Sequence, residues 1–71
     1  MNKKLTDREK EVLKLILDGF TNKQIAQKLY ISIDTAKAHV SSILYKMKVE
    51  DRIGIFKKIF GENIKEYIAN I

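Results

Sequence analysis

Apolar residues recur along the chain at helical spacing, in blocks that polar and turn-forming residues separate. The first block forms one apolar stripe, which consists of Val12, Leu13, Ile16, Leu17 and Phe20. Thr6 and Glu9 have the spacing of a capping box, in which each side chain bonds the backbone N–H of the other residue. Gly19 supplies the left-handed residue that commonly ends a helix. This pattern predicts a first helix at about residues 7–18.

Two further helices follow with a very short connection between them. Thr21 and Gln24 repeat the capping-box spacing, which predicts a helix at about residues 22–29. Ser32 is the expected N-cap of the next helix, at about residues 33–46. The short link leaves room only for a tight turn, so the two helices must cross steeply, as they do in a helix-turn-helix.

A fourth helix is expected to start near Arg52, with Asp51 as its cap, and to end at Gly61. Its apolar residues are Ile53, Ile55, Phe56, Ile59 and Phe60. They surround more of the helix than one core-facing stripe requires, so a second buried surface is predicted. Either a short fifth helix or a continuation of the fourth is marked by Ile64, Tyr67, Ile68 and Ile71. The expected fold is all-α: a four-helix helix-turn-helix domain over residues 1–71, with or without that fifth helix.

The composition excludes several functional classes. The 71 residues contain no cysteine and one histidine, which excludes disulfides, thiolate metal sites and a zinc site built by this chain alone. The histidine, serine and aspartate side chains of the third helix diverge, so we expect no catalytic site, no cofactor and no metal. The longest apolar runs are far too short to span a membrane, and the start lacks a signal-peptide core. A cytoplasmic, non-enzymatic protein is therefore expected.

Positive charge is concentrated in one segment. The net charge is +5, and residues 20–48 carry five basic and one acidic side chain, whereas residues 49–71 carry four of each. A cationic surface confined to the predicted helix-turn-helix is typical of a nucleic-acid-binding protein. A lysine-rich face that is merely solvated would give the same count.

The third helix separates an apolar side from a side suited to reading DNA. With about 100° per residue, the side opposite the core is covered by Lys37, Ala38, Ser41, Ser42 and Tyr45. Lys37 can donate to guanine, Ser41 can donate or accept, and the Ala38 methyl can contact a thymine methyl. These three residues are the expected base contacts, although Lys37 could instead contact only phosphate. No arginine lies on this side, so specificity should be modest unless a dimer reads two half-sites.

Phosphate contacts are expected at the edges of this surface. The start of the second helix offers free backbone N–H groups beside Asn22 and Lys23. The third helix is flanked by four more expected phosphate ligands, which are Thr35, His39, Tyr45 and Lys46. His39 could instead be a packed histidine at the edge of the core.

Several blocks with fixed spacing resemble a known family. They are Leu5-Thr6-x-Arg8-Glu9-x-Glu11-Val12-Leu13, Gly19, Asn22-Lys23-x-Ile25-Ala26, Leu29, Ile31-Ser32, Thr35-x-Lys37-x-His39 and Lys46-Met47-x-Val49-x-x-Arg52. Over residues 5 to about 60 the chain resembles the LuxR/NarL/FixJ-type, or GerE-like, DNA-binding domain. The resemblance implies a bacterial four-helix transcription regulator that places its third helix in the major groove of double-stranded DNA. It also suggests a link between Glu9 and Arg52.

The resemblance and the apolar surface of the fourth helix lead to separate expectations about partners. Such domains usually end a response regulator or quorum receptor, so a receiver or sensor domain is an expected partner if this chain is a fragment of a longer protein. Surplus apolar surface predicts a homodimer through the fourth helix, formed by Ile55, Phe56, Ile59 and Phe60, with the tail either joining it or folding back. Gly54-Ile55 departs from the family pattern, which bears on the geometry of that dimer. Two rival functions are a sigma-factor promoter-reading domain and a helical protein-interaction module.

Overall fold

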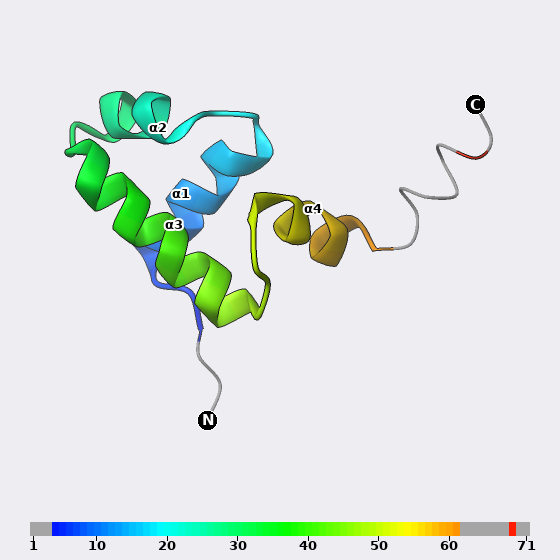
Figure 1. Cartoon of the computed structure of the whole chain (residues 1–71). Coiled ribbons are helices and arrows are strands. Elements are labelled where there is room, and N and C mark those ends of the chain that lie inside the picture. The colour runs from blue at the N-terminus through cyan, green and yellow to red at the C-terminus, as the bar shows by residue number, and fades with distance from the viewer. Residues whose placement is uncertain (1–3, 62–68, 70–71) are drawn as a thin grey trace.

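The computed structural model describes residues 4–61 and residue 69, and this part of the chain is all-α, as predicted. Its helices are α1 (Asp7–Leu17), α2 (Asn22–Leu29), α3 (Ile33–Met47) and α4 (Arg52–Phe60), which follow one another from blue to orange in Figure 1. The bounds differ from those expected by at most one or two residues. The expected fifth helix or continuation, with Ile64, Tyr67, Ile68 and Ile71, lies outside the described residues.

Each helix begins at a side-chain cap that the sequence predicts. Thr6 and Thr21 both form complete capping boxes, with Glu9 and Gln24 as the reciprocal partners. The two remaining caps accept one backbone N–H each, Ser32 from Thr35 at 3.0 Å and Asp51 from Gly54 at 2.8 Å. These bonds satisfy first-turn N–H groups that have no acceptor inside the helix.

Three of the helices end in the same way, with a left-handed residue and a backbone bond that closes the last turn. The left-handed residues are Gly19 (φ 90°), Tyr30 (φ 57°) and Lys48 (φ 59°). The closing bonds, each of 3.0 Å, run from Phe20 to Leu15, from Ile31 to Ala26 and from Val49 to Leu44. Gly19 was expected in this role. Tyr30 and Lys48 were not, because their side chains disfavour this conformation.

One core joins the four helices, and α3 packs on each of the other three. The buried residues are Val12, Ile16, Ile25, Ala26, Ala36, Val40, Ile43 and Ile55. Ile31 packs against this core at the turn between α2 and α3. Because α3 lies at the centre, its position is fixed by α1 behind it and by α2 across it (Figure 1).

The start of α4 corrects one prediction about the dimer. Ile55, expected at the homodimer interface, is 0% exposed and belongs to the core of this chain, so it cannot lie on an outer surface. Gly54 lies just before it, in close contact with the α3–α4 connection. A Cβ at this position would come within 2.8 Å of Val49 Cβ. The glycine therefore allows α4 to approach the end of α3 closely enough to bury Ile55.

Among the described residues, no helix combines the length and the apolar character needed to cross a membrane.

Candidate nucleic-acid interface

The side of α3 that faces away from the core is exposed, as the helical pattern predicted. Lys37, Ala38 and Ser41 are exposed, and Tyr45 exposes 66% of its surface. We call these four residues the outer face of α3. The opposite side lies in the core and consists of Ala36, Val40 and Ile43. A helix held from behind, with small and cationic residues in front, has the shape and charge needed to enter a groove of DNA.

Ser42 departs from the predicted arrangement. It was expected to face outward with Ser41, but it is half-buried and its hydroxyl donates to Glu9 Oε2. The helical spacing alone could not show this, because it is the packing of α1 that brings Glu9 against Ser42 and Lys46 on this side of α3. Among the serines of α3, only Ser41 is therefore available on the outer face.

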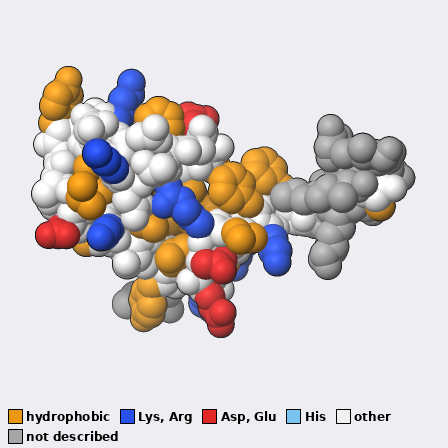
Figure 2. Space-filling view, turned by 45° about the horizontal axis from the view of Figure 1, so that its top comes forward, with side chains coloured by type: hydrophobic (Ala, Val, Ile, Leu, Met, Phe, Trp, Pro, Cys, Tyr) orange, Lys and Arg blue, Asp and Glu red, His pale blue; other side chains and the backbone are white. Residues whose placement is uncertain are grey.

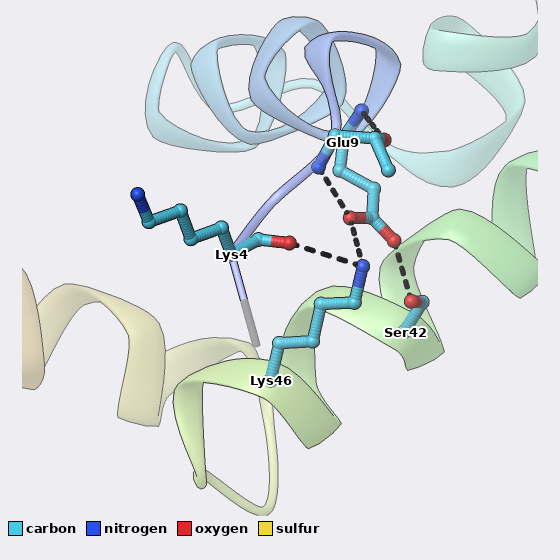
Figure 3. Close-up of polar contacts among 5 residues, drawn as sticks. Lys4, Glu9, Ser42 and Lys46 are labelled. Carbon is cyan, nitrogen blue, oxygen red and sulfur yellow. Dashed lines mark hydrogen bonds and ion pairs between the residues drawn. The ribbon is translucent and has the colours of Figure 1, made fainter. Parts of the chain in front are cut away.

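Glu9 is the one buried charged residue among those described, and it lies between α1 and α3 (Figure 3). Its carboxylate accepts hydrogen bonds from the Thr6 N–H at 2.8 Å, from Lys46 Nζ at 2.7 Å and from the Ser42 hydroxyl. The Lys46 ammonium, together with the Ser42 hydroxyl and the Thr6 N–H, lowers the pKa of Glu9 from 4.5 to about 2, against the opposing effect of burial. The carboxylate is thus charged across the physiological pH range, and it ties α3 to the start of α1.

Lys46 was expected to contact phosphate, and the structure gives its ammonium another partner. Besides its ion pair with Glu9, Lys46 Nζ donates to the Lys4 carbonyl at 3.3 Å, and its side chain is 21% exposed (Figure 3). An ammonium held in this way orients α3 instead of projecting from it. Neither partner was foreseen from the sequence, although Ser42 and Lys46, four residues apart, share one side of the helix.

The expected link between Glu9 and Arg52 is wrong. Arg52 instead donates to Asn22 Oδ1 at 2.7 Å and to the Phe20 carbonyl. The guanidinium thus connects the start of α4 to the turn between α1 and α2. Asn22, expected to contact phosphate, uses its side-chain oxygen for this bond, so its amide nitrogen and its backbone N–H are what it can offer to an anion.

The other expected phosphate ligands lie at the start of α2 and along α3. Lys23 is exposed at the second position of α2, beside first-turn N–H groups that lack acceptors within the helix. Thr35 is exposed in the first turn of α3, where its hydroxyl accepts from Ser32 at 2.8 Å. His39 is half-exposed, a position compatible with either of its two expected roles.

A second surface, on α4, is apolar. Ile53, Ile59 and Phe60 are 63%, 42% and 46% exposed, and the Phe60 ring stacks on Phe56 with centroids 6.2 Å apart. We call these four residues the α4 patch. Figure 2 shows hydrophobic side chains gathered over α4, away from the core that buries Ile55. Ile53 was not among the expected dimer residues, and it replaces Ile55 in this set because the two point in different directions from the helix.

Comparison with known families gives one match over most of the chain. The profile described as "Bacterial regulatory proteins, luxR family" matches residues 3–59. The matched segment includes all of α1, α2 and α3 and nearly all of α4.

Several regulators are similar to most of the chain. The transcriptional regulatory protein DegU of Brevibacillus brevis is 58% identical over 48 residues, which are 68% of this chain and 20% of DegU. The response regulator protein VraR of Staphylococcus aureus (strain Mu3) is 45% identical over 60 residues, which are 84% of this chain and 29% of VraR. VraR of Staphylococcus epidermidis gives the same figures. The chain thus spans less than a third of the length of these relatives.

Proposed function

Because the chain belongs to the luxR family of bacterial regulatory proteins, whose members are DNA-binding transcription regulators, we propose that it binds duplex DNA sequence-specifically through α3 in the major groove. One observation carries the proposal. Lys37, Ala38 and Ser41 form a continuous exposed surface on a helix whose opposite side is locked into the core. The first two could contact guanine and a thymine methyl, and Ser41 could contact either donors or acceptors.

Affinity would come mainly from contacts with the DNA backbone. Lys23 and the free N–H groups at the start of α2 support one phosphate site, and Thr35, His39 and Tyr45 support others beside α3. Lys46 does not belong to this set, because its ammonium is paired with Glu9.

Selection of bound duplexes from a random pool tests the proposal directly. We expect an enriched sequence that binds more tightly than a scrambled duplex, with an affinity that falls as salt rises. A helical protein-interaction module would bind no duplex even at low salt, and that result would contradict the proposal. The protein should then be titrated with the enriched duplex and with the scrambled duplex at several salt concentrations, which separates specific from nonspecific binding.

The α4 patch supports a homodimer. Exposed Ile53, Ile59 and Phe60, with Phe56 stacked on Phe60, present more apolar surface than isolated exposed residues would. A two-fold contact between two such patches would place two α3 helices toward successive major grooves, about 34 Å apart. It would also compensate for the lack of an arginine on the outer face. Sedimentation over a range of concentrations, with and without a palindromic site, tests this, and a monomer under all conditions would contradict it.

Control by another domain is also proposed. The relatives named as response regulators extend well beyond the matched region. A receiver or sensor domain acting on α4 would be a natural means of controlling dimer formation, because α4 carries the apolar contact surface. DNA affinity and self-association should be measured for this chain with and without such a domain attached. Weaker self-association with the domain attached would indicate that the domain covers the α4 patch.

A further inference from the structure

We propose that Asp34 is a specificity-determining residue that selects cytosine at the base pair next to the one contacted by Lys37. The inference rests on the proposed insertion of α3 into the major groove. It adds an acidic base contact to a surface for which only cationic, hydroxyl and methyl contacts were expected.

Asp34 lies on the same side of α3 as the outer face, about one turn before Lys37. It is exposed, in the first turn of the helix. With Ala36 as the origin and about 100° per residue, Asp34 lies at about 160°, between Ser41 at about 140° and Ala38 at about 200°. In a helix-turn-helix the N-terminal residues of the recognition helix reach the base edges. Asp34 is thus placed at the end of α3 that enters the groove.

The carboxylate is also available. With the residues that the structure describes, the Asp34 carboxylate makes no hydrogen bond and no ion pair. Lys37 follows three residues later, a spacing at which opposite charges on a helix can pair, and yet the two side chains are not paired. Both charged groups therefore remain free to contact a ligand.

The chemistry of the major groove limits what Asp34 can recognise. An ionised carboxylate only accepts hydrogen bonds. It is repelled by phosphate, by guanine O6 and N7 and by thymine O4, whereas the N4 amino group of cytosine donates to it. Adenine presents a donor beside an acceptor, which a carboxylate matches less well. In an otherwise cationic interface, an acidic residue weakens general DNA binding, so its benefit must come from the choice of base.

The spacing of Asp34 and Lys37 relates them to neighbouring base pairs. Three residues advance about 4.5 Å along a helix, close to the step of about 3.4 Å between base pairs. With Lys37 at guanine, Asp34 would reach the cytosine of an adjacent pair. We therefore expect each half-site to contain two consecutive G·C pairs, one contacted by each residue.

An acidic residue in a first turn also stabilises the positive end of a helix, and this role needs no DNA. Asp7 has that same role in α1, because it is exposed in the first turn of the helix. It lies on a different helix from the outer face of α3. Asp7→Asn is thus a control that removes the same charge from the first turn of another helix. Any effect of Asp34→Asn that Asp7→Asn lacks belongs to the position on α3.

The test is selection from a random duplex pool with the wild-type chain, Asp34→Asn, Asp34→Ala and Asp7→Asn, followed by titration of duplexes that differ at the selected pair. Wild type should prefer cytosine at one position by about five- to tenfold. Asp34→Asn should shift this preference to adenine, because an amide both donates and accepts. Asp34→Ala should lose the preference there and bind unrelated duplexes more tightly, and Asp7→Asn should keep the wild-type preference.

Two results would overturn the role of Asp34. One is an unchanged base preference in both Asp34 variants, and the other is an equal gain in affinity for all duplexes with no change in the selected sequence. Failure of the wild-type chain to bind any duplex would instead contradict the proposed function itself, so the two failures are distinguishable. Thermal melting of the four proteins identifies any variant that has lost its fold, and Asp34→Asn, the most conservative change, then decides the question.

Discussion

Replacing Glu9 with glutamine removes the buried negative charge that joins α1 to α3 while keeping the size of the side chain. The pKa of this carboxyl falls from 4.5 to about 2 on folding, chiefly because the Lys46 ammonium donates to it at 2.7 Å. A shift of this size corresponds to about 3 kcal/mol of folding free energy at neutral pH. In Glu9→Gln the amide oxygen can still accept from Thr6, but Lys46 loses its counter-charge. We expect the free energy of unfolding to drop by about 3 kcal/mol at pH 7, a large share of the stability of so small a domain.

The pH dependence gives the sharper measurement. Because the pKa is lowered in the folded state, the contribution of Glu9 is fully present above about pH 4.5 and is lost as the pH falls toward 2. Urea unfolding at a series of pH values should therefore show that the wild-type chain loses stability between about pH 4.5 and 2, whereas Glu9→Gln loses less. The free energies of unfolding of the two proteins should approach each other at the acid end of this window.

The matched control is Glu11→Gln. Glu11 is exposed on the same helix and pairs with Arg8 at 3.1 Å on the surface, so its removal should cost well under about 1 kcal/mol. If Glu9→Gln and wild type kept a constant difference from pH 7 to pH 2, the ion pair with Lys46 would not be the source of the stability. An equal loss in Glu11→Gln would likewise refute the reasoning.

Three further predictions address the interface and the packing of α4. Lys37→Ala should relax the base preference, whereas Lys23→Ala should weaken binding to all duplexes alike and reduce the slope of log affinity against log salt concentration by about one. Titrations of several duplexes at several salt concentrations measure both effects, and an equal loss on all sequences for Lys37→Ala would assign that residue to phosphate. Gly54→Ala should lower the melting temperature despite the better helix propensity of alanine, because its Cβ would lie 2.8 Å from Val49 Cβ, and an unchanged or higher value would show that α4 shifts without cost. Phe60→Asp should weaken self-association in sedimentation experiments with little loss of stability, since Phe60 is 46% exposed; unchanged association would remove the α4 patch from the dimer.

Local signals in the sequence determined where the helices lie. A capping box involves residues three apart, so Thr6 with Glu9 and Thr21 with Gln24 marked two helix starts without reference to the rest of the fold. The helical repeat then separated the buried side of α3 from its exposed side, and Lys37, on the latter, is exposed as expected. These features depend on neighbours within one or two turns, which is the range that a sequence pattern describes.

Contacts between distant residues were decided only by the tertiary structure. Glu9 was expected to bond Thr6 locally, which it does, and to link to Arg52, but its long-range partners are Ser42 and Lys46, which are 33 and 37 residues away. Within α4, Ile53 and Ile55 are the same amino acid in the same apolar segment, yet one is 63% exposed and the other is fully buried. Which of two such residues is covered depends on how α4 approaches α3, and that angle is set by packing at the end of α3, not by the spacing of apolar residues along the chain.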